Sequence, residues 1–367
     1  MAAKDMHIAV LCDRTPNEHP SLGRAKLQMV TALRDFAGQV TEFAPLPSRG
    51  RIPHATVDAL STQITNGGYD VVLSVFSMLP THKLAIPQTI VQGAIPYAVR
   101  GVPARSTGRG KMEFDVFNRP MARWLAHRDA TTLRQLDMVL WPTDVLQEGA
   151  VKQYQLNRAS SHLVPLGGHC DCLGQGRARL ISHVAPIHLL FVGEDWLSEG
   201  GAIAFETLQV LRRLGIDARL TVIGCLPPDK HVNDWVTVHP FLNLSVPDEQ
   251  AAYCAALERA HFLIRPVSDS FGFSVCDASA CGLPTLCCQA GQTPVQENIN
   301  GHILPIRSGA EQYSNWVRSY LDSPGAYVAL SRRCQDESKE RLTWSSWGAK
   351  ASQILGAGVG AKRNLVG

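Results

Sequence analysis

Short apolar segments alternate with longer amphipathic segments along the first half of the chain. The spacing of Leu27, Val30 and Leu33 predicts a helix after Gly23, and further helices are expected at residues 58–65 and 143–154. The apolar runs predict buried strands at residues 6–12, 40–43, 70–76, 88–95, 138–141 and 162–166. Strands that alternate with helices indicate a parallel sheet covered by helices on both faces.

The same alternation restarts in the second half. Amphipathic segments predict a helix between Gly200 and Gly215, and others at residues 247–260, 310–321, 326–341 and from Thr343 onward. Apolar segments predict strands at residues 188–192, 219–223, 236–240, 261–264 and 285–288. The expected fold class is therefore α/β, with two Rossmann-like domains that face each other across a cleft.

A polar segment that carries Gly and Arg separates the two halves and is the best linker candidate. It lies at residues 174–185, which gives a first domain at residues 1–173 and a second domain at residues 186–345. Residues 346–367 are expected to form a C-terminal helix that crosses back to the first domain. The Gly-rich tail from Gly356 is expected to fray.

Composition narrows the class of protein. A chain of 367 residues is long enough for two cores, and a net charge of +3 is too small to indicate a nucleic-acid partner. No apolar run approaches the roughly 20 residues that cross a bilayer, and the N-terminus lacks the apolar region of a secretory signal. Ten scattered cysteines, many of them in apolar segments, favour buried thiols. These features predict a cytoplasmic protein.

Basic residues are concentrated between Arg100 and Arg134. They greatly outnumber the acidic residues there, which are Glu113, Asp115 and Asp129. One interpretation is a binding site for an anionic or lipid-linked acceptor, with peripheral contact at the inner face of a membrane. The other interpretation is a solvated loop and helix face, which is what most charged runs are.

The segment from residue 261 to residue 305 gathers the most polar chemistry. A strand leads into a turn at Arg265-Pro266, a short acidic loop, and then a helix of small residues that begins after Gly272 and carries Asp277. Open parallel sheets bind ligands at such loops, outside the carboxyl ends of the strands. The helix start offers backbone N–H groups to an anion.

Two smaller features leave alternatives open. Gly23, at a loop-to-helix junction, fits either the approach of a phosphate or sugar to a helix start or a plain tight turn. His169, Cys170 and Cys172 stand together as metal ligands often do, but no second pair follows at zinc spacing. We therefore expect no metal site and no bound cofactor.

Residues 187–347 resemble the donor domain of retaining glycosyltransferases of family 4, which have the GT-B fold. The resemblance rests on an ordered set of short motifs rather than on any single one. They are residues 189–193, Gly200-Gly201, residues 221–224, residues 260–266, Asp269-Ser270-Phe271-Gly272, Asp277-Ala278, Gly282-Leu283-Pro284, Gly301 and Leu342-Thr343-Trp344.

The resemblance implies transfer of a sugar, with retention, from a nucleotide-sugar donor to an acceptor bound by the first domain. It assigns the sugar hydroxyls to Asp269 and the ribose hydroxyls to Asp277. Without a ligand, an N-cap role for Asp269 and a helix-dipole role for Asp277 are the alternatives. The donor-binding residues that we expect are Gly23, Arg24, Gly193, Glu199, Arg265, Ser270, Phe271, Gly272, Phe273, Ser274 and Asp277.

Two departures from the family concern charge. Asp269 and Asp277 stand where relatives have Glu, which shortens each carboxylate by about 1.5 Å. Glu194 and Glu199 stand where many relatives have Arg and Lys, the cations that stabilise a diphosphate leaving group. Either Arg265 or Arg24 substitutes for those cations, or a metal bridges, or the usual donor is not used.

A third departure concerns the catalytic histidine. Many relatives place a His on the loop after the fourth strand of the first domain, but residues 92–97 contain none. His127 and His169 are possible substitutes, and we take His127 as the candidate. Geometry has to support any such acid–base assignment.

Three functions fit this pattern. The first is an active, metal-independent glycosyltransferase. The second is a non-catalytic GT-B protein or partner subunit that has lost the phosphate-binding cations. The third is a related GT-B enzyme, either a sugar-nucleotide epimerase or a sugar phosphorylase, for which no separate motif is present.

Overall fold

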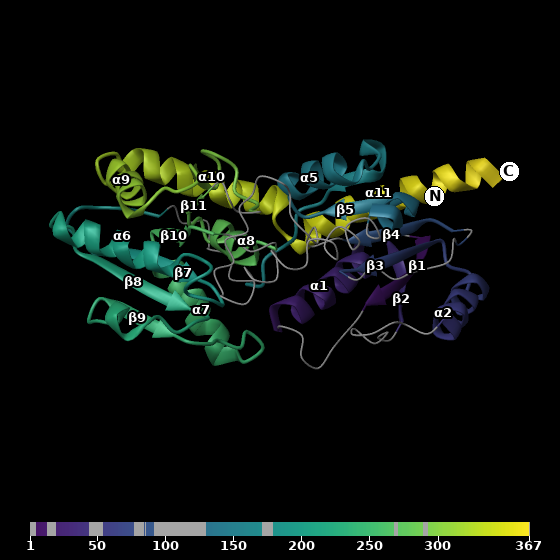
Figure 1. The fold of residues 1–367 in the computed structure, drawn as a ribbon, viewed down its shortest axis with the longest axis horizontal. Coiled ribbons are helices and arrows are strands. Elements are labelled where there is room, and N and C mark those ends of the chain that lie inside the picture. The colour runs from purple at the N-terminus through teal and green to yellow at the C-terminus, as the bar shows by residue number, and fades with distance from the viewer. Residues whose placement is uncertain are drawn as a thin grey trace, which may run out of the picture. The chain divides into compact units, whose positions relative to one another are not determined.

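The structure is a computed structural model. It describes residues 5–12, 20–43, 54–76, 84, 86–91, 130–170, 179–267, 271–288 and 293–366. These residues form two compact units (Figure 1). Unit 1 combines the described residues up to Leu166 with the C-terminal segment from Trp344, and unit 2 runs from Gly167 to Thr343.

Unit 1 is built on a six-stranded parallel sheet. Its strand order is β2-β1-β3-β4-β5-β6. The strands are β1 Met6–Cys12, β2 Gly38–Phe43, β3 Val71–Val75, β4 Gln88–Val91, β5 Met138–Trp141 and β6 Ser161–Leu163. The helices are α1 Pro20–Phe36, α2 His54–Asn66, α5 Asp144–Tyr154 and α11 Trp344–Val366, with a 3-10 turn at Arg158–Ser160.

Two helix ends of unit 1 differ from expectation. Helix α1 begins at Pro20, which suits the first helical position because proline lacks an N–H there, so Gly23 lies inside the helix and does not open it. The tail after Gly356 is helical to Val366 and not frayed. Gly358 has a packing reason for being small, since a Cβ there would lie 2.4 Å from Cε of Met138.

Helix α11 belongs to unit 1, as the sequence predicted. A Cβ on Gly348 would lie 2.8 Å from Cβ of Ala32 in α1, so the two helices approach closely. Near its end, Lys362 forms an ion pair with Asp137 at 3.1 Å. The last helix of the chain therefore completes the unit that the first strand begins.

Unit 2 is built on a second six-stranded parallel sheet, with the order β12-β11-β10-β7-β8-β9. The strands are β7 Ile187–Val192, β8 Ala218–Ile223, β9 Val236–His239, β10 Phe262–Arg265, β11 Thr285–Cys288 and β12 Gly301–Leu304. The helices are α6 Gly201–Arg213, α7 Pro247–Arg259, α8 Phe273–Ala280, α9 Ala310–Leu321 and α10 Pro324–Arg341, with a 3-10 turn at Asp229–His231.

Both faces of this sheet are covered, because neighbouring residues of a strand point to opposite faces. Leu189 and Phe191 of β7 pack in a core with α6, α9 and α10. Leu190, between them, packs in a second core with α7 and α8. The continuous apolar run in the sequence therefore reflects a strand that is buried on both sides.

The strand order creates a topological switch point in unit 2. From β7 the chain runs outward through β8 to β9, then returns to β10 on the other side of β7 and continues to β11 and β12. The loops that leave β7 and β10 therefore diverge in opposite directions. In open parallel sheets, ligands bind outside the carboxyl ends of the two strands at this point.

Arg179, inside the predicted linker at residues 174–185, is bound to unit 2. Its guanidinium donates to the carbonyl oxygens of Leu257 (2.6 Å), Glu258 (2.8 Å), Ala260 and Cys281 (2.9 Å). These carbonyls lie at the ends of α7 and α8, where helix carbonyls lack intrahelical donors and favour a cation.

Two further findings bear on the sequence-based expectations. Among the described residues, no helix is long and apolar enough to cross a membrane. The cysteines of the described ranges are buried, and they are thiols apart from Cys254, which is disulfide-bonded. The expectation of buried thiols therefore fails at Cys254.

Candidate functional site

Two loops are joined at the switch point, where β7 and β10 end. The backbone N–H of Val267, just after β10, donates to the carbonyl of Glu199 at 3.3 Å. Gly200 has φ of +85°, and a Cβ there would lie 2.7 Å from Cβ of Pro266. Glycine at this position lets the loop that precedes α6 pack directly on the loop that follows β10.

A buried ion pair lies between these strand ends. Arg265 is the last residue of β10, and its Nη1 lies 2.7 Å from Oε2 of Glu199. The Arg265 side chain is 1% exposed and also donates to the carbonyl of Val192, at the end of β7. The sequence predicted a strand that ends at Ile264, but the strand includes Arg265 and the bend begins at Pro266. Glu199 compensates the buried charge of Arg265.

The Glu199 carboxylate also binds the loop after β7. Its Oε1 accepts a hydrogen bond from the N–H of Glu194 at 3.2 Å. A Cβ on Gly193 would lie 2.5 Å from Oε2 of Glu199, so the carboxylate lies directly over the glycine. The structure thus brings together Gly193, Glu199 and Arg265, three of the residues that the sequence nominated separately.

The surroundings of this pair are acidic. The pKa of Cys225 is raised to about 11, mainly by burial and also by the negative charges of Glu199 and Asp195, while Arg265 lowers it. Glu194, Asp195 and Glu199 contribute three carboxylates within six residues of chain, against one buried guanidinium. An anionic ligand at this position meets a cation that is already neutralised.

The start of α8 is the second part of the site. Its N-cap is Gly272, which has φ of +68° and provides no side-chain hydrogen bond to the first turn. A Cβ on Gly272 would lie 2.4 Å from Cδ of Pro294, so only glycine fits between this loop and residue 294. The first N–H groups of a helix have no intrahelical acceptor, and helix starts of this kind can bind anions.

Ser274 strengthens the case for an anion at this helix start. Its side chain lies in the first turn, is only 7% exposed, and its Oγ finds no hydrogen-bond partner among the described residues. Buried hydroxyl groups are normally hydrogen-bonded. An acceptor supplied by a ligand would satisfy this hydroxyl.

Aromatic rings flank the same turn. The rings of Phe271 and Phe273 stack with centroids 5.5 Å apart and planes 3° apart. Phe273 also contacts the ring of His169 at 4.2 Å. These rings enclose the helix start in an apolar environment, where a hydrogen bond to an anion is stronger than in water.

Asp277 is buried and bound to protein groups. Its Oδ1 accepts hydrogen bonds from the N–H groups of His169 and Cys170, both at 2.7 Å, and its Oδ2 accepts from the Tyr253 hydroxyl at 3.0 Å. Burial and the nearby Asp277 carboxylate raise the pKa of Tyr253, so Tyr253 stays a neutral donor. With 1% of its surface exposed, Asp277 connects the 168–170 segment to α8. Its ribose role stays a prediction.

The remaining nominated residues lie elsewhere or outside the description. Gly23 and Arg24 lie in α1 of unit 1. Asp269, Ser270 and His127 lie outside the described residues, as does most of the basic stretch from Arg100 to Arg134. In the described ranges, no group of three or more His, Cys, Asp or Glu side chains is placed to hold a metal ion.

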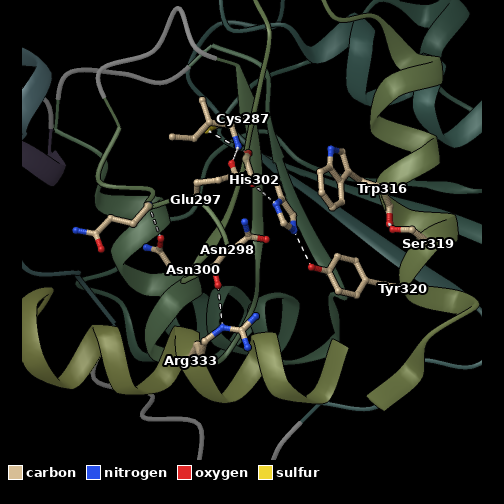
Figure 2. Close-up of polar contacts among 11 residues, drawn as sticks. Cys287, Glu297, Asn298, Asn300, His302, Trp316, Ser319, Tyr320 and Arg333 are labelled. Atoms are coloured by element: carbon tan, nitrogen blue, oxygen red, sulfur yellow. Dashed lines mark hydrogen bonds and ion pairs between the residues drawn. The ribbon is translucent and has the colours of Figure 1, made fainter. Parts of the chain in front are cut away.

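A polar cluster that the sequence did not indicate lies at the edge strand β12. Figure 2 shows His302 between two partners, with Nδ1 2.6 Å from Oε1 of Glu297 and Nε2 2.7 Å from the Tyr320 hydroxyl. The His302 ring also stacks on Trp316, with centroids 3.6 Å apart.

This cluster binds the edge strand to its surroundings. The N–H of Ile303 donates to the second Glu297 oxygen at 2.7 Å. Nearby, Arg333 donates to the carbonyl of Asn298 at 2.8 Å, so α10 holds the turn before β12 (Figure 2). His302 is the second residue of β12, so the cluster lies at the amino end of that strand, and both ring nitrogens are occupied. We therefore assign it to the attachment of β12 and α9, outside the donor site.

Solved structures with a similar fold include glycosyltransferases and a sucrose-phosphate synthase. WaaG, a glycosyltransferase involved in lipopolysaccharide biosynthesis, is 16% identical, with a TM-score of 0.60 over 95% of this chain and 99% of its own. Sucrose-phosphate synthase from Thermosynechococcus elongatus is 15% identical, with a TM-score of 0.64 over 97% of this chain and 100% of its own. The chain has the GT-B fold.

A third GT-B structure was solved with nucleotide. Anabaena HepE, in complex with UDP and glucose, is 12% identical, with a TM-score of 0.62 over 96% of this chain and 100% of its own. No protein-family model and no curated protein matches the sequence. Identities this low establish the GT-B fold, whereas the activity has to be argued from the site.

Proposed function

We propose that the protein is a glycosyltransferase that binds a nucleotide-sugar donor on unit 2. The observation that carries the proposal is the start of α8, where a glycine N-cap with positive φ lies next to Ser274, whose buried Oγ has no hydrogen-bond partner within the described structure. This pair of features suits the diphosphate of a nucleotide sugar. The bound UDP and UDP-glucose of the structurally similar HepE support a uridine nucleotide as the first donor to test.

The chemistry follows from charge. Transfer of the sugar leaves a nucleoside diphosphate with an additional negative charge on the departing oxygen. Backbone N–H groups of Phe273 and Ser274 and the Ser274 hydroxyl are positioned to stabilise that charge without reorganisation. We further propose that Asp269 orients the sugar, that unit 1 binds the acceptor, and that transfer proceeds with retention and without a metal.

The test is calorimetric titration with UDP and UDP-glucose, comparing the native chain with Ser274→Ala. Loss of one hydrogen bond to a charged group is expected to weaken binding roughly tenfold. Ser279→Ala is the matched control, because Ser279 lies on the same helix but already accepts a hydrogen bond from Asn300 at 3.1 Å. We expect it to lower stability and leave UDP affinity unchanged. Equal UDP affinity in all three proteins would contradict the proposal.

The alternative is a GT-B protein that binds a partner or a nucleotide without catalysis. The observation that favours it is the neutralisation of Arg265 by Glu199, which replaces the cation expected there with an ion pair. The two functions differ in turnover. Release of UDP from UDP-glucose by the purified protein, abolished in Asp269→Ala, would exclude the non-catalytic function.

A further inference from the structure

At the switch point, the Glu199 carboxylate makes the contacts that a bound anion would make. One Glu199 oxygen accepts from the Arg265 guanidinium at 2.7 Å, and the other accepts from the backbone N–H of Glu194 at 3.2 Å. A guanidinium and a loop N–H at a strand end are the groups that proteins use to bind phosphate oxygens. In this chain a carboxylate of the protein itself occupies them.

The Glu199 carboxylate lies close to the backbone, as a bound ligand would. Its Oε2 lies over Gly193, where any side chain would collide with it. Gly193 directly follows β7, and Arg265 ends β10, so the carboxylate lies at the two strand ends that define the switch point. General experience with parallel sheets places the ligand there.

The two side chains of the ion pair differ in how firmly the protein holds them. Arg265 is 1% exposed and is fixed to the carbonyl of Val192, whereas the Glu199 side chain is 18% exposed. Glu199 precedes α6, and its backbone carbonyl holds Val267 independently of its side chain. Rotation of the Glu199 side chain toward solvent therefore leaves both the cation and the loop in place.

We propose that the Glu199 carboxylate is an internal anion that occupies the phosphate position beside Arg265 and is displaced when the donor binds. This inference rests on the proposed function, because it takes the donor diphosphate as the competing anion. The donor exchanges places with a like charge, so Glu199 lowers donor affinity and selects against weakly bound anions. Arg265 supplies the cation that the sequence lacks at residues 194 and 199.

The experiment is calorimetric titration of UDP into Glu199→Gln. Glutamine keeps the length of the side chain and its acceptor oxygen but removes the charge. UDP affinity is expected to rise at least about tenfold, the direction that follows from removing a like charge beside a diphosphate. Asp195→Asn is the matched control, since Asp195 carries the same charge on the same loop but its carboxylate accepts from the N–H of Ser198 at 2.6 Å. We expect a much smaller rise.

A second variant tests whether Arg265 is the cation that binds the donor. In Glu199→Gln/Arg265→Gln the pair is neutral on both sides, and the gain in UDP affinity is expected to disappear while thermal unfolding shows a folded protein. A gain that persists would exclude Arg265 as the donor cation. Weaker or unchanged binding in Glu199→Gln, or an equal gain in Asp195→Asn, would overturn the displacement.

These outcomes separate the two proposals. If the native chain binds UDP in a Ser274-dependent manner but Glu199→Gln does not bind more tightly, only the inference about Glu199 fails. If neither the native chain nor Glu199→Gln binds UDP, the donor site on unit 2 fails, and the inference fails with it.

Discussion

Asp277 shows how one residue type supports two different explanations. The resemblance to family 4 implies that it binds the ribose, yet its two oxygens accept from the N–H groups of His169 and Cys170 and from Tyr253. A side chain shortened from Glu to Asp stays close to its own helix, which suits bonds to a segment packed against that helix. The structure therefore supports an anchoring role for Asp277.

Asp277→Asn tests that role. The amide replaces an acceptor with a donor, which leaves it facing other donors in a buried place. We expect the free energy of unfolding to fall by about 2–4 kcal/mol and the amides of His169 and Cys170 to exchange hydrogen faster. Urea denaturation and hydrogen exchange measure the two effects.

The control for this variant is Asp217→Asn, a surface carboxylate that pairs with Arg212 and is 49% exposed. Its effect on stability is expected to be small. Unchanged stability and exchange in Asp277→Asn, together with lost UDP affinity, would contradict the anchoring role and favour contact with the ribose.

Contacts between individual residues explain which features of the site could not be predicted from the sequence. Gly193, Glu199, Arg265 and Ser274 are all nominated by motif and charge, but the pairing of Glu199 with Arg265 joins positions 66 residues apart. Arg265, expected to face the donor, is instead neutralised by Glu199, which stands where the family resemblance implies a lysine. From the sequence Glu199 indicates only a missing cation, whereas in the fold its carboxylate is paired with Arg265.

Among the elements, β7 and β10 also carry a titratable pair at their amino ends. The Nδ1 of His261 accepts from the N–H of His188 at 3.0 Å, and the two rings stack 5.9 Å apart. Burial lowers the pKa of His261 to about 4, with smaller contributions from His188 and Arg179. Burial also lowers the pKa of His188, and the positive charges of Arg259 and Arg219 lower it further.

This pair predicts loss of stability in acid. Because the folded-state pKa of His261 lies below its unfolded value of about 6.5, the unfolded chain takes up the proton first as the pH falls. Stability from this group is complete above about pH 6.5 and is lost toward pH 4, by roughly 2–3 kcal/mol. Urea denaturation between those pH values measures the slope.

His261→Asn keeps an acceptor near Nδ1 but does not titrate, so its stability should depend less on pH in this window. His183→Asn is the control, because His183 lies on the surface beside Asp322. An equal pH dependence in the native chain and His261→Asn would assign the acid sensitivity to other groups.

The hydrophobic pattern identified most elements, and the exceptions have physical reasons. Helix α9 lies at the residues the periodicity predicts. Strand β12 was missed because it has only four residues, follows an Asn-rich turn, and carries a buried His302 whose polarity is satisfied by Glu297 and Tyr320. Short strands with paired polar residues resemble loops in sequence.

For the molecule as a whole, the GT-B fold is retained at low sequence identity. Structures that are 10–16% identical cover nearly the whole length of this chain. The alternation of strands and helices sets the two sheets, and few positions need a particular residue for it. The residue at a loop position can therefore change from a cation to a carboxylate without disturbing the architecture.

The return of α11 to unit 1 is a whole-chain property that two glycines test. In Gly348→Ala the added Cβ meets Ala32 at 2.8 Å and Phe36 at 2.9 Å, whereas at Gly360 nothing lies within 4 Å. We expect Gly348→Ala to lower stability by about 1–3 kcal/mol through overpacking. Gly360→Ala should be neutral or stabilising by up to about 1 kcal/mol. Thermal unfolding compares them, and equal effects would contradict the close packing of α11 on α1.

The most direct test of a nucleotide-sugar site on unit 2 is a crystal structure of the protein with UDP. The account predicts the diphosphate at the start of α8, within hydrogen-bonding distance of Ser274 Oγ and the first N–H groups, with the Glu199 side chain turned away from Arg265. UDP bound elsewhere, or a diphosphate with no contact to α8, would contradict it.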